Sequence, residues 1–440
     1  MTLIRAGLWS IATWLWVEED EYKWLALIVG VALAIRVVWV LVFQIPPILG
    51  SDAAAYDRLG WRLAQGQGYV TGDGTPTAYW PVGYPAFLAA IYVIFGYSWL
   101  AAGIANALLG TVSVALTYRL AREFLSSRSS LVAAGAVAFL PSHITTYTSV
   151  LRNEMLHTAL VLAALIAACY LVRHPNWKNA ALLGLVIGVG LYVRPILILF
   201  PSIVALLVMI RGAEIRKSVA LAGITLLVSV LAISPWTARN NFAMGGLVLT
   251  STSGADAFYE GNGPGATGEF RYVAKEDTFS DSSEMTVYRE GIEMGVRHII
   301  SHPEQWLVLL PKKFFHLWAS DRYDMGLGIF PEGFRVIVPA LWVIAQAYWT
   351  IIVIGATMAA VSRPILGYWL KFPAILLPLT LLYWTAFHIM FLGSGRYHIQ
   401  MIPVVAIIAV HLLERGRDWR AWLPARWSKS GVSGTLQGEC

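Results

Sequence analysis

The sequence predicts an all-α polytopic membrane protein with about ten transmembrane helices. The chain of 440 residues is 57% hydrophobic and only 13% charged, with a mean hydropathy of +0.62. Its apolar runs are long enough to cross a bilayer, and its basic residues gather in alternate loops. The formal charge of +6 therefore reports topology rather than nucleic-acid binding, because cytoplasmic loops retain lysine and arginine.

About ten apolar segments are predicted to span the membrane. The fifth and sixth are short and meet in a tight turn at YVRP, residues 192–195, and the seventh ends at SPW, residues 234–236. In order, the predicted spans are Trp24–Phe43, Ala101–Ala121, Leu131–Ser149, Glu154–Val172, Lys178–Tyr192, Pro195–Ile210, Ser218–Pro235, Val336–Ala360, Phe372–Leu392 and Arg396–Leu413.

Loop charges orient these spans. The short loops VRHPNWK, IRGAEIRK and SRPILGYWLK are basic and are therefore cytoplasmic, together with both termini. The long loops 44–100 and 237–335 then lie on the extracytoplasmic side. Each long loop holds a short apolar stretch, 81–96 and 303–319, that either spans the membrane or lies in its interface. If only one of these stretches were a span, the basic loops that follow it would move to the extracytoplasmic side, which argues against that count.

The domain prediction is a single membrane unit over residues 1–413, followed by a disordered cytoplasmic tail over residues 414–440. Neither an internal repeat nor a cleavable signal peptide is evident in the sequence. A disulfide between Cys169, inside an apolar run, and Cys440, in the tail, is not expected. The sequence contains no glycine-rich phosphate loop, no HExxH and no CxxC pair.

Asp52 is the first candidate catalytic residue. It lies in GSDAAAYDRLG, just after the first span, where Ser51 can cap a helix that begins at Asp52. Helical spacing places Asp52 on one face with Tyr56, Leu59 and Leu63, the stripe expected to be buried, while Asp57 lies mostly off it. A carboxylate on that stripe is paired, capping or catalytic; the alternative is a simple preference of an acid for a helix N-terminus. The helix dipole would lower the pKa of Asp52 and burial would raise it.

A second acid, Glu154, lies between the third and fourth spans in TSVLRNEMLH. Arg152 and Glu154 form either a surface ion pair at a helix start or a turn that faces the first long loop and brings the acid near Asp52. If a divalent metal binds, Asp52 and Glu154 are its candidate ligands, but the sequence favours no metal and no other cofactor.

Three arginines lie at extracytoplasmic span ends, where the topology rule does not require them: Arg194, Arg239 and Arg396. Each alone could extend to the lipid headgroups. Together they indicate an anionic partner at the interface, since arginine binds phosphate in a bidentate way, and Lys312 and Lys313 could join them. Polyprenyl phosphates place a phosphate at this depth. The glycine-rich stretch 251–270 is either a substrate-covering loop or an ordinary connector.

The stretches SDAAAYDRLGWRLAQGQGY and PTAYWPVGYPAFLAAIYVIFG resemble the first extracytoplasmic loop of GT-C glycosyltransferases. The resemblance is to the protein-mannosyltransferase-like (family 39) bacterial branch, which uses polyprenyl-phosphate sugars. GVGLYVRP, SPWTARNN, EGNGPGATGEF and RYHIQMIPVVAIIAV resemble later landmarks of that branch in the same order.

The resemblance implies an inverting transfer in which Asp52 acts as general base, with Glu154 near the position of a second acid. It assigns the donor phosphate to Arg194, Arg239 and Arg396, and Lys312 is added as a candidate from its place on the stretch 303–319. Candidate substrate-binding residues are Tyr56, Arg152, Asn240, Asn262 and Tyr397. Two departures, Ala53 after Asp52 and YWPVGYP in place of a lysine-bearing EKPP motif, argue against carrying over a protein or lipid A acceptor.

The predicted function is an integral glycosyltransferase that moves a sugar from a polyprenyl-phosphate donor to an acceptor hydroxyl. The predicted location is a bacterial inner membrane, with the site facing the periplasm. The acceptor is a glycan, a lipid or a protein. The alternatives are a transporter or flippase for a polyprenyl-linked sugar, and an enzyme of the O-antigen ligase or polymerase type. A transporter needs charges near the bilayer midplane, where Arg36 is the main example here.

Overall fold

The computed structural model describes residues 21–43, 46–321 and 332–415. Within them the chain is helical and forms no strand, only an isolated bridge between Val70 and Pro76. Six helices are long and apolar enough to cross a membrane, and four shorter apolar helices accompany them. All ten predicted spans coincide with helical segments, so the prediction of an all-α polytopic membrane protein is confirmed.

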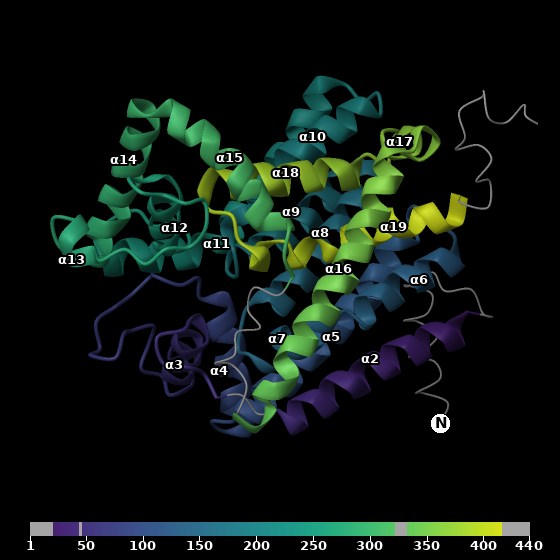
Figure 1. Cartoon of the computed structure of the whole chain (residues 1–440). Coiled ribbons are helices and arrows are strands. Elements are labelled where there is room, and N and C mark those ends of the chain that lie inside the picture. The colour runs from purple at the N-terminus through teal and green to yellow at the C-terminus, as the bar shows by residue number, and fades with distance from the viewer. Residues whose placement is uncertain (1–20, 44–45, 322–331, 416–440) are drawn as a thin grey trace, which may run out of the picture.

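The helices of the membrane bundle run from the centre to the right of Figure 1. They are α2 (Tyr22–Val42), α5 (Trp99–Ala121), α6 (Ser127–Ala138), α7 (Pro141–Ser149), α8 (Glu154–Arg173), α9 (Trp177–Leu191), η1 (Pro195–Leu199), α10 (Phe200–Ile210), α11 (Ile215–Met244), η2 (Glu332–Ile337), α16 (Val338–Val361), α17 (Arg363–Trp369), α18 (Leu376–Phe391), η3 (Gly395–Tyr397), η4 (Ile399–Met401) and α19 (Ile402–Arg415).

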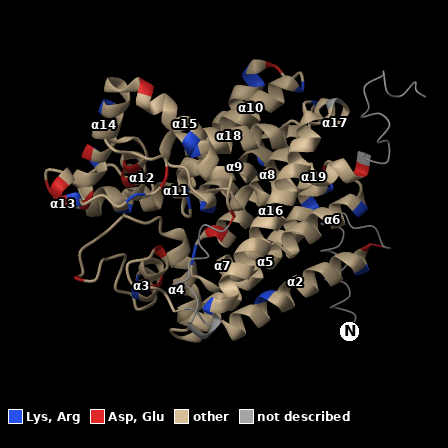
Figure 2. Cartoon of the chain, in the orientation of Figure 1, with Lys and Arg blue, Asp and Glu red and all other residues tan. Residues whose placement is uncertain are grey.

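A cap formed by the two long loops, residues 46–98 and 245–321, covers one end of the bundle, at the left of Figure 1. It contains α3 (Asp52–Ala64), α4 (Gly83–Phe95), α12 (Ser253–Asn262), α13 (Lys275–Thr278), α14 (Glu284–Ser301) and α15 (Pro303–Trp318). At 13 and 16 residues, α4 and α15 are about 20 and 24 Å long, shorter than the roughly 30 Å hydrocarbon core. Charged residues concentrate on the cap and at the far end of the bundle (Figure 2).

The third predicted span, 131–149, is two helices rather than one. The helix breaks between Ala138 and Pro141 because proline lacks the N–H that would continue the backbone ladder. Arg36, buried in α2, supplies donors to the freed end of α6: its guanidinium bonds the carbonyl oxygens of Ala138 at 2.9 Å and Val137 at 3.4 Å. The intramembrane charge of Arg36 therefore caps a broken helix.

The seventh span continues past its predicted end at Pro235, and α11 runs on to Met244. Pro235 cannot donate to the carbonyl of Leu231, and the Ser234 hydroxyl bonds that oxygen instead, at 2.8 Å. The extension carries Arg239 and Asn240 on the helix, up to the underside of the cap.

In the cap, α3 packs closely against α4. A Cβ at Gly60 would lie 2.8 Å from the Cβ of Leu88, so only glycine permits this approach. The expectation that Asp57 lies off the buried face is wrong: it is 4% exposed and accepts hydrogen bonds from Tyr92 and Tyr97, at 2.6 and 2.5 Å. Asp57 thus joins α3 to the end of α4.

The glycine-rich stretch 251–270 is not a loop throughout, since its first half forms α12. The predicted tail begins at the last residues of α19, and residues 416–440, including Cys440, lie outside the described residues. Cys169 is buried in α8 as a free thiol.

Candidate active site

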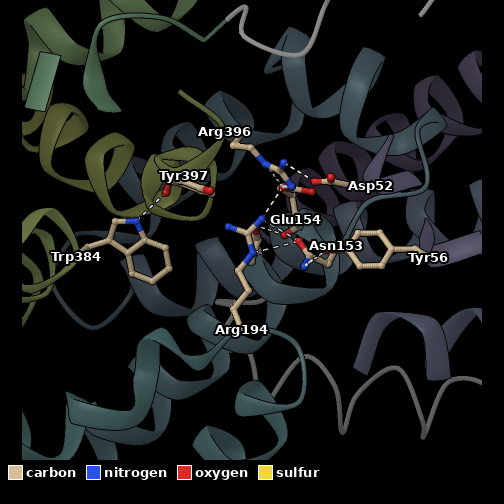
Figure 3. Close-up of polar contacts among 9 residues, drawn as sticks. Asp52, Tyr56, Asn153, Glu154, Arg194, Trp384, Arg396 and Tyr397 are labelled. Carbon is tan, nitrogen blue, oxygen red and sulfur yellow. Dashed lines mark hydrogen bonds and ion pairs between the residues drawn. The ribbon is translucent and has the colours of Figure 1, made fainter. Parts of the chain in front are cut away.

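Four elements converge where the cap meets the bundle, and each presents one charged side chain (Figure 3). Asp52 is the first residue of α3 and Glu154 the first of α8, while Arg194 follows α9 and Arg396 lies in η3. The first and last of these residues, Asp52 and Arg396, are 344 positions apart in the sequence, yet the four form one network of ion pairs.

Glu154 is the centre of this network. Its side chain is fully buried, and its Oε1 accepts from Arg194 Nη2 at 2.6 Å and from Arg396 Nη2 and Nε at 3.1 and 3.2 Å. The other oxygen, Oε2, is buried and has no hydrogen-bond partner in the described part of the chain. Glu154 therefore holds the two guanidinium groups side by side.

Asp52 differs from Glu154 in exposure. Its side chain is 23% exposed, against 0% for Glu154, and it forms an ion pair of 2.6 Å with Arg396. Burial raises the pKa of Asp52, but the charges of Arg396, Arg152 and Arg194 outweigh burial and the net pKa lies below its usual value. Asp52 is thus an ionised carboxylate that faces open space.

Asn153 links the network to α3 and was not among the predicted site residues. Its Oδ1 accepts from Arg194 at 2.9 and 3.1 Å, and its Nδ2 donates to the Tyr56 hydroxyl at 3.1 Å. Burial raises the pKa of Tyr56, and the charge of Asp52 adds to that effect. Its position beside Glu154 at a helix start was the available signal, since asparagine favours such sites.

The local sequence explains how Arg194 reaches this point. Pro195 disfavours a helical conformation in the residue before it, and Arg194 is extended, with φ −154° and ψ 135°. The turn is fixed to the cap, because Gly83 N–H donates to the Tyr192 carbonyl at 2.7 Å and a Cβ at Gly83 would lie 2.7 Å from the same group. The YVRP turn therefore sets the position of Arg194 relative to the first loop.

Two aromatic contacts hold η3, which carries Arg396. Trp384 Nε1 donates to the Tyr397 carbonyl at 2.7 Å, as Figure 3 shows. The next residue, His398, is fully buried and stacks on Trp349 with ring centroids 4.4 Å apart. The Tyr397 ring lies 5.4 Å from the guanidinium carbon of Arg194 and 5.8 Å from that of Arg396, within reach of cation–π attraction.

The network borders a cavity of about 250 Å³, which we call the first cavity. Asp52, Tyr56, Arg194, Arg396 and Tyr397 line its polar side. Its other walls are mostly apolar and are formed by Pro195, Ile196, Phe270, Phe387, Phe391 and Leu392. The cavity thus joins an arginine-rich polar wall to a hydrophobic one.

The residues around the first cavity suit an anionic ligand. Arg194 and Arg396 both line its polar wall, and their guanidinium groups are held side by side by Glu154. Two adjacent arginines beside a hydrophobic wall are an arrangement suited to an anion attached to an apolar chain.

Other predicted site residues lie elsewhere. Arg239 does not line the first cavity; it donates to the backbone oxygens of Thr77 at 2.6 Å and Tyr69 at 2.7 Å, which anchors the first long loop to α11. Asn240 is buried beside it and donates to the carbonyls of Val248 and Thr250, both at 3.4 Å. Both residues bind backbone, so the structure gives them a loop-anchoring position.

Asn262 and Lys312 also lie away from the first cavity. The Asn262 amide donates to the backbone oxygens of Phe258 and Met390, both at 2.9 Å, and so joins α12 to α18. Lys312 is exposed, whereas its neighbour Lys313 is fully buried and donates to Asn262 Oδ1 at 2.7 Å. Burial lowers the pKa of Lys313 to about 8.

Glu260 lines the first cavity and was not predicted. Burial raises its pKa to about 8, and the nearby charge of Asp256 contributes. Its only signal in the sequence was a position in the glycine-rich EGNGPG stretch, where no pattern distinguished it.

The expectation that the site holds no metal stays untested. Within the described ranges no group of three or more His, Cys, Asp or Glu side chains gathers as a metal site would require. The Asp52 and Glu154 carboxylates are each paired with Arg396, so they already have cationic partners.

Comparison with known proteins agrees with this architecture. Residues 80–238 match the sequence model of the family described as dolichyl-phosphate-mannose-protein mannosyltransferase. No curated protein matches the chain. The solved structures that match include the oligosaccharyltransferase of Archaeoglobus fulgidus, called AglB, in its apo form, at 15% identity and a TM-score of 0.55, covering 95% of this chain and 54% of that one.

The same archaeal protein matches in two further states. Its complex with an inhibitory peptide and a dolichol-phosphate gives a TM-score of 0.52 at 15% identity, covering 92% of this chain and 52% of that one. Its complex with Zn and sulfate gives a TM-score of 0.52 at 15% identity, covering 90% of this chain and 50% of that one. The chain thus spans about half the length of these structures, and at this identity the likeness concerns the fold.

Proposed function

We propose that this chain is a membrane glycosyltransferase of the GT-C type and that it transfers a sugar from a polyprenyl-phosphate-linked donor to an acceptor hydroxyl on the extracytoplasmic side of a bacterial inner membrane. One observation carries the proposal: a partly exposed carboxylate, Asp52, and two arginines, Arg194 and Arg396, line one cavity that continues into a hydrophobic wall. The complex of the archaeal protein with a dolichol-phosphate supports a lipid phosphate as the donor's carrier.

In the proposed reaction the phosphate lies against Arg194 and Arg396, and the prenyl chain lies along the apolar wall. The acceptor oxygen attacks the anomeric carbon from the face opposite the phosphate, and its proton passes to the Asp52 carboxylate. A bond forms between that oxygen and the anomeric carbon as the bond to the phosphate oxygen breaks. The products are the glycosylated acceptor, with inverted configuration, and polyprenyl phosphate, whose added negative charge the arginines stabilise.

Glu154 acts as a positioning residue in this mechanism. It is fully buried and binds both guanidinium groups through one oxygen, so it fixes the distance between Arg194 and Arg396. Asn153 adds orientation, since Arg194 donates twice to its Oδ1.

Asp52 and the donor phosphate would compete for Arg396. Arg396 holds Asp52 ionised through a 2.6 Å ion pair, which also weakens it as a base. A phosphate that binds Arg396 shares that charge and raises the basicity of Asp52. Donor binding would thereby activate the base.

The variant Asp52→Asn tests the proposal in proteoliposomes with radiolabelled polyprenyl-phosphate sugars. We expect transfer to fall by about 10²–10⁴-fold, the usual contribution of a general base, while the protein still folds and retains lipid. Asp73→Asn is the matched control, because Asp73 is an exposed acid of the same loop outside the first cavity. Full activity of Asp52→Asn would refute the base assignment. Translocation of the sugar-lipid without transfer would favour a flippase.

A further inference from the structure

A second cavity of about 390 Å³ lies between the two halves of the cap, and Asp52 does not line it. One wall is α3 and the loop that follows it, residues 70–80. The opposite wall comes from α12, α13 and α14. The proposed reaction assigns a donor site to the first cavity and leaves this one without an occupant.

One helix connects the two cavities. Asp52 and Tyr56 face the first cavity, whereas Ala55, Arg58 and Arg62 face the second, as the spacing of residues on a helix dictates. At a rise of 1.5 Å per residue, Arg58 and Arg62 lie about 9 and 15 Å from Asp52 along the helix axis. A ligand in the second cavity that extends along α3 would therefore reach the carboxylate of Asp52.

A thin partition separates the cavities, since Tyr79, Trp80 and Asp256 line both. The Tyr79 hydroxyl donates to Asp256 at 2.5 Å, and Lys275 donates to the same oxygen at 2.8 Å. Tyr79 is half-buried, and a rotation of its side chain away from the partition would give up its hydrogen bond to Asp256 and its contact with the Lys275 ammonium, which lies 4.8 Å from the ring centroid.

The charged residues that line the second cavity favour an anion, since Arg58, Arg62 and Lys275 carry three positive charges against the two negative charges of Asp256 and Glu284. Asp256 is paired with Lys275, at 2.8 Å. Glu284 accepts from Thr77 and Thr252 hydroxyls at 2.6 and 2.8 Å and so connects the two halves of the cap.

Two arginines remain on the α3 wall. Arg62 donates to the Gly72 carbonyl at 2.8 Å, which uses one of its five donors. Arg58 is exposed and forms no hydrogen bond or ion pair among the described residues. Its guanidinium is thus available to a ligand carboxylate or phosphate.

We propose that the second cavity binds the acceptor, and that the acceptor is an anionic glycan, a sugar chain bearing carboxylate or phosphate groups. This inference rests on the proposed function, since it supplies that reaction's second substrate. Arg58 and Arg62 bind the anionic group, and the Trp80 and Tyr79 rings offer apolar faces to the sugar rings. The acceptor hydroxyl then lies toward Asp52, past Tyr79.

The test measures binding without donor, by calorimetry on the chain in nanodiscs. The probes are trigalacturonate with its neutral counterpart galactotriose, and phosphorylated mannotriose with mannotriose. We expect an anionic trisaccharide to bind at least about tenfold more tightly than its neutral partner, as an arginine–anion contact would provide. The variant Arg58→Glu should lose at least about tenfold, and Arg289→Glu, an exposed arginine of α14 outside the cavity, should lose nothing.

Absence of binding, equal binding of neutral and anionic probes, or an Arg58→Glu variant that binds normally would overturn the proposal. An acidic peptide that binds through Arg58 when both anionic glycans fail would replace the glycan by a protein acceptor. If the anionic glycan binds as expected but no sugar is transferred from any lipid donor, the proposed function fails and the binding site stands.

Discussion

Glu154 is assigned a structural role and Asp52 a catalytic one, and the two assignments can be tested by comparing Glu154→Gln with Asp52→Asn. Glutamine keeps the shape of Glu154 but loses the charge that pairs with Arg194 and Arg396. In the wild type, three N–H···O contacts at 2.6, 3.1 and 3.2 Å join a charged guanidinium to a charged carboxylate. In the variant only the guanidinium of each contact is charged. At about 1 kcal/mol for each contact, the loss of unfolding free energy is about 3 kcal/mol, near the cost of removing one partner of a buried ion pair.

Asp52→Asn should cost much less, about 1 kcal/mol or below, because Asp52 makes one ion pair and is 23% exposed. The assay is unfolding by sodium dodecyl sulfate in mixed micelles, followed by near-UV circular dichroism, together with the affinity for polyprenyl phosphate. Glu154→Gln removes a negative charge from beside Arg194 and Arg396, so phosphate affinity per folded molecule should not fall. Equal destabilisation by the two variants, or a Glu154→Gln variant as stable as the wild type, would refute the assignment of Glu154 as the structural centre.

Three other variants test single assignments. Arg239→Ala removes two hydrogen bonds to loop oxygens and should cost about 2 kcal/mol of stability while the affinity for polyprenyl phosphate is unchanged, whereas the sequence-based phosphate role requires that affinity to fall. Arg36→Met leaves the carbonyls at the end of α6 without a donor and should cost about 2–4 kcal/mol, with kcat of the folded protein unaltered. Burial raises the pKa of Glu260 to about 8, so the wild type should lose stability as the pH rises from the ordinary carboxyl range through 8; Glu260→Gln should abolish that loss, as thermal unfolding across the pH range would show.

The fold was predictable because a membrane imposes long apolar runs that the sequence displays directly. The break in the third span had a signal too, since Pro141 lies in the middle of the apolar run. What the sequence could not supply was the compensation, Arg36 from α2, because that contact joins residues about a hundred positions apart.

The candidate site divides along a similar line. The sequence singled out Asp52, Glu154, Arg194 and Arg396, and the structure brings them together. It also singled out Arg239 and Asn240, which the structure places against loop backbone. In the sequence Arg239 cannot be told from Arg194 or Arg396, because an arginine that binds phosphate and one that binds backbone oxygens can both follow a predicted span. The choice between Lys312 and Lys313 could not be made, since neighbouring positions on a helix point in different directions and α15 is apolar on both sides.

The ion pair between Arg396 and Asp52 makes the order of binding visible in a pH profile. In the free protein, burial raises the pKa of Asp52 but nearby arginines lower it further, so the net pKa lies below the usual carboxyl value. A general base must be deprotonated, so the rate falls as the pH falls through its pKa. Once a donor phosphate shares Arg396, the pKa of Asp52 rises. The pH dependence of kcat reports the donor-bound protein, and that of kcat/KM for the donor reports the free protein. The acid limb of kcat should therefore lie at higher pH than the acid limb of kcat/KM. Coincident limbs, or the reverse order, would show that the phosphate does not compete with Asp52 for Arg396.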